Sequence, residues 1–146
     1  MILTFKSEFP VDTEALFAFC TSTDGFVRHF PMAVRWHTGP ARWGADDVLD
    51  FSFRTFGIWS RYVARITQFV PGISFTDEMQ SGIYRRCAHT HEFRAQGTGT
   101  VLVDIVDFSL GYGGLADRLI GLPLITRTFR RRHDLLERHF GGRIMP

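Results

Sequence analysis

Apolar and polar side chains alternate along most of this 146-residue chain, which is the pattern of β-strands that bury one face. In residues 2–9, Leu3, Phe5 and Phe9 share one face, and Pro10 ends the segment. The alternation returns later in six segments that are separated by short turns. These segments are residues 34–38, 48–56, 59–70, 73–80, 84–95 and 100–110. Short turns between successive strands predict a meander of neighbouring antiparallel strands.

Two short helices are predicted between the first strand and the second. Asp12 and Asp24 each stand where a side chain can cap the first turn of a helix, and Pro31 ends the second helix. A longer helix is predicted from Leu115 to Phe140, because apolar residues recur there at helical spacing. The chain therefore contains one strand, two short helices, six strands and one long helix.

The long helix has two features that change this simple picture. Gly121 and Pro123 interrupt the pattern near its start, so we expect a break or a kink there. Farther along, the run Arg130-Arg131-Arg132 allows two interpretations, a solvated face with helical ion pairs or a site for an anionic partner. The spacing of the surrounding charges favours the solvated face, although the sequence does not decide the role of this run.

The order of elements predicts the fold class. A curved sheet needs its apolar face covered, and the C-terminal helix is the only predicted element long enough to cover it. We therefore expect a single α+β domain that spans residues 1–146, in which a curved seven-stranded antiparallel sheet surrounds the C-terminal helix. Its length suits one domain.

Several segments resemble the SRPBCC, or START-like, superfamily, in the branch described as polyketide cyclase/dehydrase-like or ligand-binding. The resemblance extends over essentially the whole chain, and a Gly at position 111 replaces the Pro that is frequent in that branch. It rests on Phe75-x-Asp77-x-Met79, the run from Gly82 to Phe93, Gly99-Thr100, residues 104–108 and Phe129-Arg130-x-Arg132-His133. The resemblance implies a helix-grip fold with a cavity between the sheet and the helix.

The aromatic content favours such a cavity. Fifteen Phe in a chain of this length exceed what a compact core requires. The side chains that we expect to line the cavity share the concave face of the sheet or the apolar stripe of the helix. They are Phe30, Trp36, Phe51, Phe53, Tyr62, Phe75, Met79, Cys87, His89, His91, Val106, Phe108, Ile125 and Phe129.

His89 and His91 are the most specific chemical feature of the sequence. They lie two residues apart in a predicted strand, so both imidazoles point to the same face. If Gly97-Thr98 form a two-residue turn, His91 lies opposite Asp104. Side chains in such a pair have Cβ atoms about 4.5–5.5 Å apart, so a hydrogen bond between His91 and Asp104 is feasible.

Three interpretations of this cluster remain open. It can be a satisfied polar network in which Asp104 fixes the tautomer of His91. It can orient the polar end of a hydrophobic ligand such as a lipid, a polyketide or another cyclic molecule. It can also be a catalytic pair, in which His91 and Asp104 move protons in a cyclase/dehydrase-type enzyme. Binding of a hydrophobic small molecule is the function that we expect, with the enzyme as the alternative.

We expect no metal and no other cofactor. The His-x-His pair is similar to part of the cupin motif, but Ala95 and Gln96 stand where that motif has its Glu, and only Asp104 could supply a third ligand. Nucleotide-binding and hydrolase motifs are absent from the sequence.

Charge and cysteine content limit the remaining partners. A formal net charge of +2 is too small to indicate nucleic acid, and no apolar run of about 18 residues predicts membrane insertion. Cys20 and Cys87 match no metal-binding spacing, and no signal peptide is visible, so we expect free thiols and a cytoplasmic location. The sequence does not distinguish a monomer from a homodimer.

Overall fold

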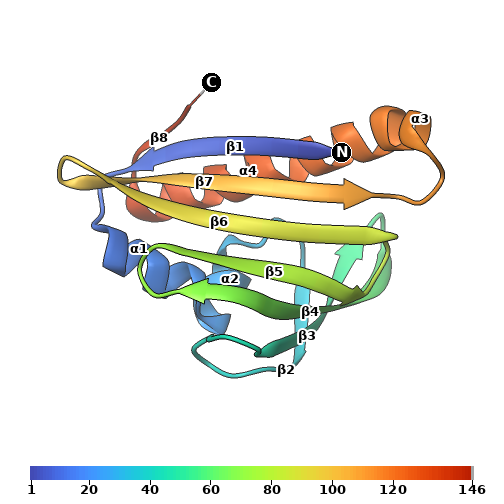
Figure 1. The fold of residues 1–146 in the computed structure, drawn as a ribbon, viewed down its shortest axis with the longest axis horizontal. Coiled ribbons are helices and arrows are strands. Elements are labelled where there is room, and N and C mark those ends of the chain that lie inside the picture. Colours follow the sequence, from blue (N-terminus) through green and yellow to red (C-terminus); the bar gives the residue numbers. More distant parts are fainter. Residues whose placement is uncertain (146) are drawn as a thin grey trace.

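Eight strands form one antiparallel sheet that curves around the C-terminal helix in a computed structural model describing residues 1–145 (Figure 1). The strand order is β2-β3-β4-β5-β6-β7-β1-β8. The strands are β1 (Ile2–Phe9), β2 (Val34–Thr38), β3 (Val48–Thr55), β4 (Ile58–Val70), β5 (Ser74–Ser81), β6 (Arg86–Gln96), β7 (Gly99–Ser109) and β8 (Arg143–Ile144). The predicted α+β fold with a curved sheet around a long helix is thus confirmed.

The predicted strands are all present, with ends that differ by at most two residues from the expected ranges. The two-residue strand β8 was not predicted; it pairs with β1 after the long helix has ended. Pro146, the last residue of the predicted domain, lies outside the described residues.

Two short helices, α1 (Thr13–Cys20) and α2 (Thr23–His29), follow β1 as predicted. The Asp12 carboxylate caps α1 by accepting a hydrogen bond from the amide of Ala15 at 2.7 Å. The prediction that Asp24 caps α2 was wrong, because α2 begins earlier and the hydroxyl of Ser22 accepts from the amide of Gly25 at 3.1 Å. Asp24 instead lies in the first turn of α2.

The C-terminal helix continues without interruption through the predicted break. It consists of α3 (Gly114–Ala116), a π-helical segment (Asp117–Gly121) and α4 (Leu122–Phe140). Pro123 lies in the first turn of α4, directly after the π-helical segment, and a proline inside a continuous helix removes one amide donor from the regular hydrogen-bond pattern. One wide turn thus stands where a break was predicted. Among the described helices, none is long and apolar enough to cross a membrane.

Two contacts attach the π-helical segment to strand β7 and to Leu110, the residue that follows it. The carboxylate of Asp117 accepts a hydrogen bond from the amide of Leu110 at 2.7 Å. Gly121 packs so closely on the Phe108 ring that a Cβ atom at Gly121 would overlap it. Because both contacts precede α4, they set the position from which α4 crosses the concave face of the sheet.

Candidate ligand cavity and buried polar cluster

A cavity of about 120 Å³ lies between the concave face of the sheet, α2 and α4. Its walls are mostly apolar, and aromatic rings from β3, β4 and α2 form a large part of them. A cavity of similar volume, about 150 Å³, accommodates benzene in an engineered protein, whereas drug-sized ligands occupy about 300–1,000 Å³. In the conformation described here, the cavity has room for one small ring.

The wall contains many, but not all, of the side chains predicted to line it. The predicted residues that line the cavity are Phe30, Phe51, Phe53, Tyr62, Cys87, His89, His91, Ile125 and Phe129. The others, Trp36, Phe75, Met79, Val106 and Phe108, pack in the surrounding core. Trp36 stacks on Phe51 with ring centroids 5.9 Å apart, so this second layer supports the wall.

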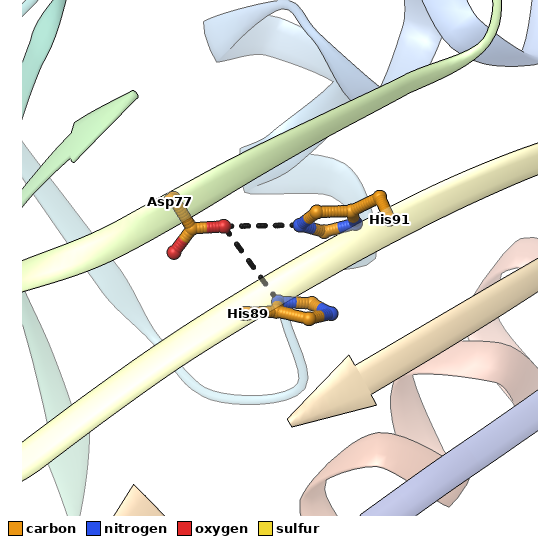
Figure 2. A group of neighbouring side chains, drawn as sticks. All are labelled: Asp77, His89 and His91. Atoms are coloured by element: carbon orange, nitrogen blue, oxygen red, sulfur yellow. Dashed lines mark hydrogen bonds and ion pairs between the residues drawn. The ribbon is translucent and has the colours of Figure 1, made fainter. Parts of the chain in front are cut away.

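The polar part of the wall belongs to a buried cluster that joins four strands and the long helix. Each element contributes side chains to it: Ser7 from β1, Asp77 from β5, His89 and His91 from β6, Asp104 from β7, and Arg132 and His133 from α4. Figure 2 shows three members of the cluster, with both imidazoles of β6 turned towards the carboxylate of Asp77. Of this cluster, Asp77, His89, His91 and Arg132 line the cavity.

The fully buried Asp104 anchors the cluster to α4. Its Oδ2 atom accepts a hydrogen bond from Nε2 of His133 at 2.8 Å. Since a carboxylate can only accept, His133 must donate from Nε2, and its Nδ1 atom is then free to accept from the Ser7 hydroxyl. The tautomer of His133 is thereby fixed from both sides.

The predicted register of the two histidines is confirmed, but the hydrogen bond that this register makes feasible is not formed. His91 is paired with Asp104 across β6 and β7, and Nδ1 of His91 lies 3.1 Å from Oδ1 of Asp104. That oxygen nevertheless has no hydrogen-bond partner among the described residues. His91 instead uses Nε2, which is 3.0 Å from Oδ2 of Asp77 on the other neighbouring strand.

Arg132 was expected on a solvated face, and this expectation was wrong. Its side chain is only 8% exposed; NH1 lies 3.4 Å from Nδ1 of His89, and NH2 lies 3.2 Å from Nδ1 of His91. The physical reason is helix phase, because Arg132 follows Phe129 by three residues and precedes Leu136 by four, which places all three on one face. Arg130 and Arg131 are exposed, as predicted.

Burial and neighbouring charges set the ionisation of the cluster. Burial lowers the pKa of His89 to about 4 and so keeps its imidazole neutral. Burial alone would raise the pKa of Asp104, but the Arg132 guanidinium and the adjacent histidines hold it well below its usual range. Burial would likewise raise the pKa of Asp77, which the hydrogen bond from His91 and nearby positive charge keep lowered. The two carboxylates of the cluster thus face the one guanidinium of Arg132.

Phenol and thiol groups near the cavity are neutral for the same reason. Burial raises the pKa of Tyr62 well above its usual range, and burial raises the pKa of Cys20 to about 12 and that of Cys87 to about 11. Both cysteines are free and buried. These groups therefore offer a possible ligand uncharged surfaces.

Sequence reasoning missed Ser7, Asp77, Arg132 and His133. For Asp77 a signal was present, because it lies between Phe75 and Met79 on the face already assigned to the interior. His133 lies four residues after Phe129, within the same inward face as Arg132. The run of basic residues conceals both helix positions, since its pattern is also typical of a solvated surface.

Comparison with known proteins identifies the fold. No protein-family model matches the sequence, and no curated protein matches it. Protein TTHA0849 from Thermus thermophilus is 17% identical with a TM-score of 0.75, and the match covers 94% of this chain and 95% of that chain. Ginseng major latex-like protein 151 from Panax ginseng is 10% identical with a TM-score of 0.70, covering 96% and 97% of the two chains.

A START superfamily protein from Mycobacterium smegmatis is 12% identical to this chain. Its TM-score is 0.74, and the match covers 95% of this chain and 96% of that chain. At such identities the likeness is one of fold. The chain therefore has the START-like, helix-grip architecture that its sequence resemblance implied.

Proposed function

We propose that this chain binds a small apolar molecule with one polar group in the cavity between the sheet and α4. The observation that best supports this function is the division of the cavity wall. Most of the wall is aromatic or aliphatic, whereas His89, His91 and Arg132 contribute buried polar groups and Asp77 contributes a half-buried carboxylate. Burial of the apolar part would supply affinity, at about 25 cal/mol per Å², and the polar groups would fix the orientation.

The cavity volume narrows the class of ligand. About 120 Å³ suits a single ring with a short substituent. A lipid or a polyketide would require the cavity to expand. Ile83 is 46% exposed and Met32 and Thr55 are half-buried, and all three line the cavity. The entrance is therefore proposed to lie between the end of α2, the β3–β4 turn and the connection before β6.

Binding of p-cresol, a benzene ring that carries one methyl group and one hydroxyl group, tests this proposal. Methyl resonances of Leu49, Leu124 and Ile125, which line the cavity, should shift in a saturable way when p-cresol is titrated into the protein. Ala64→Leu should abolish these shifts, because Ala64 lies in the wall and is 1% exposed, so the larger side chain fills the space.

Ala88→Leu is the matched control, since Ala88 lies in the same sheet but on the face opposite to the neighbouring His89. The control should bind p-cresol as the unmodified protein does, and thermal unfolding should show that both variants are folded. Absence of binding to the unmodified protein would contradict the proposal. Binding that survives in a folded Ala64→Leu variant would also contradict it.

Acid–base catalysis is the second candidate function, and the contact between His91 and Asp77 favours it. A histidine that is hydrogen-bonded to a carboxylate and lines a cavity has the arrangement of a general acid or base. The proposed partner is then Asp77 rather than Asp104, because Asp104 is fully buried and does not line the cavity. Ligand binding has the broader support, because Nε2 of His91 is already hydrogen-bonded to Asp77 and is not free to exchange a proton with a ligand.

A further inference from the structure

We propose that Asp77, His89 and His91 bind a divalent first-row transition-metal ion such as Zn²⁺ or Co²⁺ at the wall of the cavity. This inference goes beyond the proposed binding of an apolar molecule and does not depend on it. It rests on three ligand atoms, on the carboxylate behind them and on the charge of the cluster.

The three ligand atoms already converge. They all lie within 4.8 Å of one another. Oδ2 of Asp77 is 3.0 Å from Nε2 of His91 and 3.7 Å from Nδ1 of His89 (Figure 2). Ligand bonds of about 2.0–2.1 Å in a tetrahedral site separate neighbouring ligand atoms by about 3.3–3.4 Å. Small side-chain rotations would therefore bring these atoms to coordination distances.

The sheet explains why these side chains meet. Asp77 is paired directly with His89 across β5 and β6, and His91 is the next residue on the same face of β6. The ring of His91 also stacks on Phe75, with centroids 3.9 Å apart, which restrains its orientation. The site is thus built on two neighbouring strands rather than on loops.

The second nitrogen of each imidazole faces one buried carboxylate. Nε2 of His89 and Nδ1 of His91 both lie 3.1 Å from Oδ1 of Asp104. Neither Nε2 of His89 nor this oxygen has a hydrogen-bond partner among the described residues. Histidines that bind metals commonly donate their other ring N–H to a carboxylate. Asp104 is positioned to accept such a hydrogen bond from both rings.

The charge of the cluster also favours a cation. Asp77 and Asp104 supply two carboxylates, and Arg132 is the guanidinium that faces them. These two carboxylates outnumber the one guanidinium of the cluster, in a largely buried place where charged groups need partners. A divalent ion bound between Asp77 and the histidines would supply such a partner.

Arg132 competes with the ion for the same histidines. Its NH1 and NH2 groups lie 3.4 Å and 3.2 Å from the Nδ1 atoms of His89 and His91. Metal binding requires the guanidinium to leave Nδ1 of His89, and His91 must carry its proton on Nδ1 so that Nε2 can bind the ion. Loss of the Arg132 charge should therefore tighten binding.

The donor set and its surroundings define the kind of ion. Two imidazoles and one carboxylate suit Zn²⁺, Co²⁺, Fe²⁺ or Ni²⁺, whereas Ca²⁺ and Mg²⁺ prefer oxygen ligands. All three side chains line the cavity, so the remaining coordination positions would face the space proposed for the apolar molecule.

Titration of metal-stripped protein with Co²⁺, followed by visible absorption, tests the site. One equivalent should bind and give the absorption bands of a coordinated ion. Asp77→Asn and His91→Gln, which preserve side-chain size, should each weaken binding at least tenfold. Arg132→Met should bind Co²⁺ at least tenfold more tightly than the unmodified protein.

His37→Gln is the matched control, because His37 is an exposed imidazole whose partner is the Ser52 hydroxyl. Binding should be unchanged in this variant, and near-ultraviolet circular dichroism should show that all variants are folded. The proposal is overturned if the unmodified protein binds no stoichiometric Co²⁺, or if folded Asp77→Asn and His91→Gln variants bind it unchanged. An unchanged or weaker affinity in Arg132→Met would overturn the competition with Arg132.

The titration of p-cresol into the same metal-stripped protein separates this inference from the proposed function. If p-cresol binds and Co²⁺ does not, the metal site fails and the cavity proposal stands. If Co²⁺ binds and p-cresol does not, the cavity proposal fails and the metal site stands.

Discussion

Nε2 of His133 and Oδ2 of Asp104 are 2.8 Å apart, and both side chains are shielded from solvent. This hydrogen bond connects α4 to the middle of β7 and holds the helix against the sheet. Asp104→Asn removes the buried charge that faces Arg132 and the histidines, so we expect the free energy of unfolding to fall by about 3–5 kcal/mol. Urea denaturation measures this loss.

Asp107→Asn provides the comparison for that variant. Asp107 lies on the same strand and pairs with Arg86 at the surface, where an ion pair is worth up to about 1 kcal/mol. Equal losses in the two variants would show that the buried position of Asp104 has no special importance.

Gly121 is expected to tolerate no side chain. A Cβ atom at this position would overlap the ring of Phe108, so Gly121→Ala should destabilise the protein by about 1–3 kcal/mol. Gly114 lies in the same continuous helix, and a Cβ atom there would meet no other atom within 4 Å. Gly114→Ala should therefore be neutral or stabilise by up to about 1 kcal/mol. Thermal unfolding of both variants checks the contrast, which a stable Gly121→Ala variant would refute.

Stability in acid should depend on Asp50. The bidentate hydrogen bonds from Arg61 lower the pKa of Asp50 in the folded protein. The contribution of Asp50 is therefore complete above its usual pKa of about 4 and is lost as the pH falls through the lowered folded value. Asp50→Asn should consequently lose less stability than the unmodified protein between about pH 5 and pH 2.

Arg61→Gln should likewise reduce the loss of stability at acid pH, because it removes the partner of Asp50 and leaves the carboxylate. Urea midpoints measured at several pH values test both variants. If the stability of either variant falls as steeply with decreasing pH as that of the unmodified protein, the result would count against a role for the Asp50–Arg61 pair.

The two thiols should react slowly in the folded protein. Cys20 is 1% exposed and Cys87 is 8% exposed, and thiol reagents require an accessible thiolate. A disulfide reagent added at neutral pH should label both cysteines rapidly in urea and only after a long delay in buffer. Cys20→Ser should reduce the final count by one; rapid labelling in buffer would contradict the burial of these side chains.

The sequence could predict the contacts that local geometry determines. The two-residue turn at Gly97-Thr98 fixes the register of the flanking strands, so the pairing of His91 with Asp104 could be counted from the turn and is confirmed. The same alternation predicted the inward face of β3 correctly, where Leu49, Phe51 and Phe53 are buried.

The other contacts of the cluster depend on which neighbouring element each side chain contacts, and the pattern along one strand does not show this. A residue in the middle of a sheet has a neighbour on each side, and His91 bonds to Asp77 on β5 rather than to Asp104 on β7. To predict the inward position of Arg132, its phase on the helix would have to count for more than the usual exposure of basic residues. The π turn also escaped prediction, because a Gly and a Pro near a helix start indicate a break more often than a widened turn.

The widened turn at Asp117–Gly121 has a consequence for variation in chain length. The amide of Leu122 bonds to the carbonyl of Asp117, five residues back rather than four, so this turn holds one residue more than an α-helix would. Deleting a single residue here would restore an ordinary α-helical turn, so the inward side chains from Ile125 onwards would keep their orientation. Insertions and deletions among chains of this architecture should therefore accumulate at this turn and spare the helix that follows it.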